Sequence, residues 1–175
     1  MADSVTAAAE RNQVTRPTGV QIEFVSGEAA RFEFLWEDAP DTCVVLSEKL
    51  PAQGNAIHAI YSGTQVGVLF DPSIDAPLQN ATTCHMPGDL IWMHYPALSR
   101  FAHPDAVSEI CWAYDRHTRM VMPGQFVQIA GSVFATFAGG ADEWSEFAAR
   151  SAQVRWDGQA QVRISMYSGV VEATR

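Results

Sequence analysis

Histidine side chains are the first candidates for chemistry in this chain, and His58 is the strongest of them. It lies near the end of a stretch rich in β-branched, aromatic and small residues, and Tyr61 and Ser62 follow closely. A neutral imidazole at such a place can exchange a proton or hold a polar ligand. It can equally bond a neighbouring loop and fill space, so both interpretations of His58 stay open.

A second group of reactive side chains surrounds a Pro-Gly turn. Cys84 and His85 precede this turn and His94 follows it. Together with His58 they could supply soft or borderline ligands for zinc or copper. His85 and His94 are nine residues apart, and no recognised ligand spacing is present. We therefore predict no metal and no cofactor, with Cys84, His85 and His94 as weak candidates and the two loop residues exposed.

A binding cleft is the function that these residues favour. Ligand pockets are mostly apolar and contain a few convergent polar groups. Aromatic side chains near the histidines could supply the apolar part. The residues predicted to contact a small molecule or a peptide are His58, Tyr61, Ser62, Trp92 and His94.

Covalent catalysis by a cysteine is not expected. On the strand predicted at residues 108–114, Cys111 shares a face with Glu109, and Asp115 follows on that side. Neighbouring carboxylates raise the pKa of a thiol, which is the wrong direction for a nucleophile. The sequence also contains no serine-hydrolase elbow, phosphate loop, dinucleotide fingerprint or His-Glu-x-x-His motif. Whether the protein is an enzyme stays open.

Composition limits the partners that can be expected. The chain has 175 residues, of which 47% are apolar and 18% charged, as in a single globular domain. A net charge of −9 would repel a phosphate backbone, so nucleic acid is not an expected partner. No apolar run is long enough to span a membrane, and the first residues do not resemble a secretory signal. We expect a cytoplasmic protein with reduced cysteines, a disordered tail at residues 1–18 and one domain at residues 19–175.

Two short helices are predicted. Pro40 can begin a helix and Pro51 cannot continue one, which places the first helix at residues 40–50. Its apolar stripe at helical spacing consists of Ala39, Cys43, Leu46 and Leu50. The second helix is predicted at residues 142–151, with Asp142 as its N-cap.

The rest of the chain indicates short β-strands. Alternating patterns and turn residues place them at residues 20–24, 32–36, 54–61, 64–70, 89–95, 108–114, within 125–137, at 154–156 and at 161–166. Asp157-Gly158 is read as the hairpin turn between the last two. Hairpins dominate and no strand-helix-strand repeat occurs. This predicts a mainly β fold, a closed antiparallel barrel of about eight strands capped by the two helices.

Four motifs give this chain a resemblance to a known family. In order along residues 20–167 they are Ala39-Pro40-Asp41-Thr42, Leu50-Pro51, His58-Ala59-Ile60-Tyr61-Ser62-Gly63 and Pro87-Gly88-Asp89. Their order and spacing resemble a bacterial family of unknown function with a cyclophilin-like fold. The first helix and the His58 strand also resemble, more distantly, those of the cyclophilins themselves.

The resemblance implies a cyclophilin-like barrel but no known reaction. Cyclophilins isomerise X–Pro bonds with the help of an arginine, and the matching position here is Ala59. Prolyl isomerase activity is therefore the disfavoured alternative, unless Arg100 or Arg119 reaches the cleft. A further alternative is a homo-oligomeric scaffold without ligand chemistry.

Overall fold

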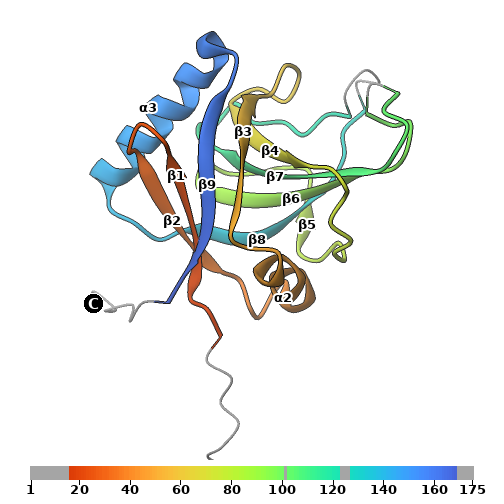
Figure 1. Ribbon diagram of the computed structural model, residues 1–175, viewed down its shortest axis with the longest axis horizontal. Coiled ribbons are helices and arrows are strands. Elements are labelled where there is room, and N and C mark those ends of the chain that lie inside the picture. The colour runs from red at the N-terminus through yellow and green to blue at the C-terminus, as the bar shows by residue number, and fades with distance from the viewer. Residues whose placement is uncertain (1–15, 101, 123–126, 169–175) are drawn as a thin grey trace, which may run out of the picture.

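Eight antiparallel strands close into a barrel in the computed structural model, which describes residues 16–100, 102–122 and 127–168 (Figure 1). The strands are β1 (Gly19–Phe24), β2 (Ala29–Phe34), β3 (Ala52–His58), β4 (Gln65–Phe70), β6 (Asp89–Tyr95), β7 (Val107–Ala113), β8 (Gly131–Phe137) and β9 (Ala160–Tyr167). Their order is β2-β1-β9-β3-β4-β7-β6-β8, and β8 pairs back with β2 to close the ring. The predicted closed, mainly β barrel is confirmed. The short strand β5 (Ala81–Thr82), within a predicted loop, adds to β8.

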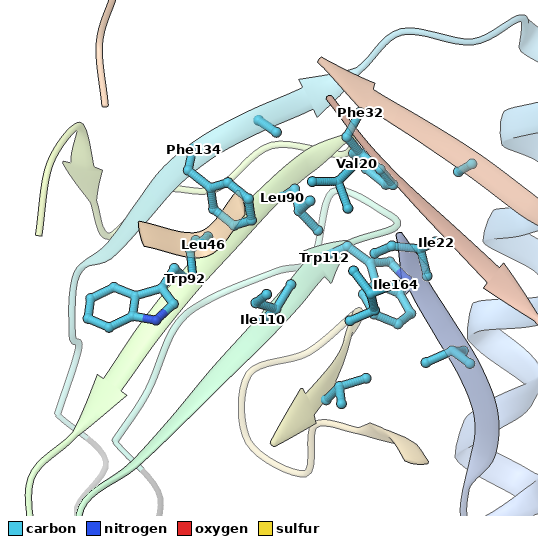
Figure 2. Close-up of a cluster of buried hydrophobic side chains, with 14 of the residues drawn as sticks. Val20, Ile22, Phe32, Leu46, Leu90, Trp92, Ile110, Trp112, Phe134 and Ile164 are labelled. Atoms are coloured by element: carbon cyan, nitrogen blue, oxygen red, sulfur yellow. The ribbon is translucent and has the colours of Figure 1, made fainter. Parts of the chain in front are cut away.

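Strict alternation explains the hairpin β1–β2. Val20, Ile22 and Phe24 are buried, and the residues between them point outward. Phe32 and Phe34 continue the buried face across the turn. Figure 2 shows how side chains from these strands meet others from β6, β7, β8, β9 and α2 (Pro40–Glu48) inside the barrel.

Helix α2 forms where the two prolines predicted it. Pro40 lies in its first turn, and the whole predicted stripe from Ala39 to Leu50 is buried. Ala39 at the N-cap offers no side-chain acceptor, so another residue must satisfy the first amides. The Gln79 Oε1 accepts hydrogen bonds from the backbone N–H groups of Asp41 (2.9 Å) and Thr42 (3.0 Å).

Helix α3 (Ala141–Asp157) corrects the prediction for this region. It begins after Gly140 rather than at an Asp142 cap, and it continues through the strand predicted at residues 154–156. The Asp157-Gly158 pair is not a hairpin turn. Gly158 ends the helix with a φ of 84°, and its N–H donates to the Val154 carbonyl. The same left-handed conformation suits a helix end and a tight turn, so the dipeptide alone could not distinguish them.

Neither described helix combines the length and apolarity needed to cross a bilayer. The helices lie on different sides of the barrel (Figure 1). Phe147 of α3 and Leu46 of α2 both enter the main core.

A second apolar cluster covers the opposite face of β6 and β7. On β6, Ile91, Met93 and Tyr95 alternate with the residues of the main core. They pack with Cys111 on β7 and with Met120 from the segment after β7. Every residue of β7 is consequently buried, including Glu109 on the face that it shares with Cys111.

The tail predicted at residues 1–18 lies outside the described residues as far as residue 15. From residue 16 onward the chain contacts the barrel. The Arg16 guanidinium is 5.2 Å from the Trp36 ring, the Pro17 carbonyl accepts a hydrogen bond from Trp36 Nε1, and the Thr18 N–H donates to Tyr167. The boundary between tail and domain stays a prediction.

Candidate functional site

A cavity of about 220 Å³ lies at the end of β3, where His58 stands. Strand β3 and the turn after it supply Ile57, His58, Ala59, Ile60, Tyr61 and Ser62. The other lining residues are Gln65, Tyr95, Arg100, Glu109 and Val121. Three of the five residues predicted to bind a ligand, His58, Tyr61 and Ser62, are therefore brought together here. The volume is below the usual range for drug-sized ligands, so a small molecule or one residue of a peptide fits it.

Two loops hold one wall of this cavity in place. The Ser62 carbonyl accepts a hydrogen bond from the Arg119 N–H (2.8 Å), and the Thr64 carbonyl accepts one from the Tyr114 N–H (3.1 Å). The turn after β3 is thus tied to the segment after β7, which also supplies Val121. Ile60 remains 74% exposed at the rim, where it can meet a ligand.

His58 forms hydrogen bonds through both of its ring nitrogens. Nδ1 is 2.7 Å from the Ala59 carbonyl oxygen, which can only accept, so Nδ1 carries the proton. Burial lowers the pKa of His58, which keeps the ring neutral near pH 7. Nε2 therefore accepts a hydrogen bond from the Tyr114 hydroxyl at 2.7 Å. The imidazole joins the end of β3 to the end of β7, and a direct ligand contact by His58 stays a prediction.

A buried carboxyl group forms the floor of the cavity. Glu109 on β7 is only 6% exposed, and its Oε2 accepts a hydrogen bond from the Tyr95 hydroxyl at 3.0 Å. Gly67 lies beneath the carboxyl, and a Cβ at position 67 would overlap Glu109 Oε1. Burial raises the pKa of Glu109, while the charge of Arg100 and the Tyr95 hydrogen bond oppose that rise. Gly67 thus creates the space in which a titratable group can be buried.

Gln65 contributes an amide that is 2% exposed. Its Oε1 accepts no hydrogen bond from any residue that the structure describes. The side chain also lies close to the Cys111 thiol, where it opposes a rise in the thiol pKa. The pKa of Cys111 is raised, first by burial and then by Glu109. The predicted direction is confirmed, although burial rather than a carboxylate is its main cause.

Arg100 brings a positive charge to the same cavity. Its guanidinium carbon is 5.5 Å from the centroid of the Tyr95 ring, a distance suited to a cation–π contact. Arg100 and Glu109 are the basic and the acidic residue among those that line the cavity. The site therefore combines a guanidinium and a carboxyl group with an uncharged buried acceptor.

Trp92 and His94 lie outside this cavity lining. Trp92 is 2% exposed and belongs to the main core, as Figure 2 shows. His94 is exposed, stacks on the Trp92 ring, and places Nδ1 3.2 Å from Ser73 Oγ. Successive side chains of β6 point to opposite faces, so Tyr95 reaches the cavity and its neighbour His94 does not. Ligand binding by the predicted residues stays a prediction.

The weak metal candidates are dispersed. Cys84 is exposed, but His85 is 4% exposed, so the expectation of an exposed loop histidine was wrong. Burial lowers the pKa of His85, whose Nε2 lies 3.4 Å from the Gly131 carbonyl oxygen. Within residues 16–100, 102–122 and 127–168, no three histidine, cysteine or acidic side chains form a group that could hold a metal ion. Metal content stays a prediction.

Four lining residues were not singled out from the sequence as site residues: Ile57, Gln65, Glu109 and Val121. Glu109 had a usable signal, because a lone carboxylate interrupts a strand whose other residues are mostly apolar. Arg100 was named only as a conditional contributor. Gln65 carried no signal, since its importance comes from burial beneath a distant loop.

A larger hollow of about 460 Å³ lies over β1, β3 and β9. Polar surface residues such as Glu23, Gln53 and Arg163 line it. None of its described residues holds a buried polar atom without a partner. The cavity at His58 is the stronger candidate for this reason.

Comparison with known proteins identifies a family. The chain belongs to the family described as "Protein of unknown function (DUF3830)", whose model matches residues 21–166. No curated protein shows a significant match. Among solved structures, McbB in complex with tryptophan is similar, with 16% identity, a TM-score of 0.60, and coverage of 87% of this chain and 46% of that chain. The chain thus spans about half the length of McbB. The hypothetical protein AF2241 from Archaeoglobus fulgidus has 14% identity, a TM-score of 0.48, and coverage of 87% and 98% respectively. At this identity the likeness to McbB shows the fold alone.

Proposed function

We propose that this member of the DUF3830 family binds a small molecule, or one residue of a peptide, in the cavity at His58. One observation supports this most strongly: Gln65, whose buried Oε1 has no partner among the described residues, is one of the residues that line the cavity. A buried acceptor left unsatisfied costs about 1–3 kcal/mol. A ligand that donates a hydrogen bond to this oxygen would recover that free energy.

The other walls suit an apolar group. Ile57 and Ile60 come from β3 and the turn after it, and Val121 faces them from the loop after β7. Burying an aliphatic group against such side chains contributes about 25 cal/mol for each Å² removed from water. The expected ligand therefore combines a branched apolar part with a hydrogen-bond donor.

Isobutyramide is a suitable first probe, because it carries both parts in a few atoms. On its addition we expect shifts of the methyl NMR signals of Ile57, Ile60 and Val121. Val44 is the matched control, since it is also partly exposed but lies on α2. Tryptophan, which is bound in the McbB structure, can be tested in the same titration. Equal shifts at Val44 and at the cavity methyls, or no shifts at all, would contradict the proposal.

Prolyl isomerase activity is the second candidate, and the position of Arg100 favours it. A fixed donor near the amide nitrogen weakens the partial double bond that must twist. Arg100 lines the same cavity as Ala59, where the resemblance to cyclophilins places their arginine. However, a proline ring needs an apolar pocket, and the buried polar side chains of Glu109 and Gln65 are part of this lining.

We therefore expect no acceleration of X–Pro isomerisation by the wild-type protein. A protease-coupled peptide assay measures this cleanly because the spontaneous reaction takes tens of seconds or more. The same assay on Arg100→Gln provides the control. Wild-type catalysis that falls about a hundredfold or more in Arg100→Gln would establish the isomerase and displace the leading proposal.

A further inference from the structure

We infer that the ligand of this cavity is a zwitterion of the α-amino acid class. Its ammonium group would lie between the Glu109 carboxylate and Gln65 Oε1, and its carboxylate would face the Arg100 guanidinium. This inference rests on the proposed function and names the ligand of the same site. It follows from three features of the lining: paired acceptors, one cation, and apolar walls.

The acceptors share one face of the sheet. Gln65 and Gly67 are two residues apart on β4, so they occupy the same side of that strand. The Glu109 carboxyl lies over Gly67, and the Tyr95 hydroxyl donates a hydrogen bond to Glu109 Oε2. An ammonium group has three donors and no acceptor, and it matches a carboxylate next to an amide oxygen.

The cation lies in the same small space as this carboxyl. Arg100 lines the cavity, and its charge is close enough to lower the pKa of Glu109. A guanidinium offers donors in a fork that a carboxylate accepts in pairs. A ligand with both charged groups can contact both residues at once, whereas a simple amine or a simple acid matches only one of them. The protein's net charge of −9 would by itself repel a simple acid.

The apolar walls of the cavity favour an aliphatic side chain on the ligand. Ile57, Ile60 and Val121 surround the remaining space, which suits an aliphatic group such as that of leucine. A volume of about 220 Å³ is small for a ligand site, so a free amino acid fits it better than an extended peptide.

Binding of an ammonium group should release a proton. The titratable and charged groups that face Glu109 in the described structure are Arg100, Tyr95 from β6 and Cys111 from its own strand, while β4 presents Gln65 and Gly67. Burial favours the protonated form of Glu109 in the empty cavity. A cation beside it favours the ionised form, so the carboxyl proton leaves to solvent as the ammonium binds.

The test is titration calorimetry with L-leucine and three relatives that lack one or both charges. These are 3-methylbutylamine, 4-methylpentanoate and N-acetyl-leucine amide. We expect leucine to bind at least about tenfold more tightly than each relative. Binding of the uncharged amide as tightly as leucine would overturn the inference and leave the proposed function standing. If leucine does not bind although isobutyramide shifts the cavity methyls, only the inference of an amino-acid ligand fails. If neither leucine nor isobutyramide binds, both this inference and the proposed function are contradicted.

Two isosteric or near-isosteric substitutions separate the roles of the charges. Arg100→Met should weaken leucine binding about tenfold or more, and Arg116→Met on the exposed loop is the matched control. Glu109→Gln keeps an acceptor for the Tyr95 hydroxyl. This variant should abolish the proton release that accompanies leucine binding, which is measured by calorimetry in buffers of different ionisation enthalpy. Urea unfolding shows whether the two variants are folded. Unchanged leucine affinity in Arg100→Met, or proton release that persists in Glu109→Gln, would overturn the assignment.

Discussion

Replacing Phe147 by alanine is expected to lower the free energy of unfolding by about 3–5 kcal/mol, the range for truncating a buried aromatic ring. Phe147 is fully buried on α3 and packs its ring against Phe24 and Trp112, with centroids 5.5 and 5.6 Å away. It also contacts Phe32 and Trp144. Removal of the ring leaves a cavity among four aromatic neighbours, and it loosens the helix that they anchor.

The same helix provides a matched control. Trp156 is 78% exposed near the C-terminal end of α3, so Trp156→Ala removes a larger ring at little cost. We expect a change within about 0.5 kcal/mol for this surface substitution. Urea unfolding of both variants measures the difference. Similar midpoints for Phe147→Ala and the wild type would show that α3 does not anchor the barrel as described.

Replacing Gly63 by alanine is expected to disturb both stability and the cavity. Gly63 has a φ of 79°, and a Cβ there would overlap the backbone carbonyl oxygen of His117. A steric clash with a backbone atom cannot be relieved by a rotamer change. The turn after β3 must therefore separate from the loop after β7. Overpacking of this kind costs about 1–3 kcal/mol. Because these two segments carry Ser62 and Val121, binding of isobutyramide should weaken as well.

Gly140 is the matched control for this substitution. It precedes α3 with a φ of −84°, and an added Cβ would meet nothing within 4 Å. Gly140→Ala should therefore leave the isobutyramide shifts of the cavity methyls unchanged, and its loss of stability should stay below about 1 kcal/mol, because its cause is only that alanine is a poorer N-cap than glycine. If Gly63→Ala behaves like Gly140→Ala in both measurements, the two loops do not form the wall described above.

The sequence alone determined the elements that depend on local patterns. Alternation identified the buried faces of β1 and β2, and the spacing of Pro40 and Pro51 located α2. These signals are strong because the side-chain period of a strand or helix is a property of the local backbone. This reasoning failed where one signal serves two structures, as at Asp157-Gly158, which ends a helix here instead of turning a hairpin.

The tertiary structure decided the composition of the candidate site. His58, Tyr61 and Ser62 are neighbours in sequence and share the cavity, but Gln65, Arg100 and Glu109 join them only because β4, β6 and β7 are adjacent in the barrel. The lone carboxylate of Glu109 in an apolar strand was a local signal, but no local pattern could reveal which distant segment would cover the outer face of β7. Burial depends on which distant segment packs over a residue, and that burial sets the pKa of Glu109 and leaves the Gln65 oxygen without a partner among the described residues. For these reasons the sequence could indicate the fold and the position of the cavity, while the groups available to a ligand followed from the closure of the barrel.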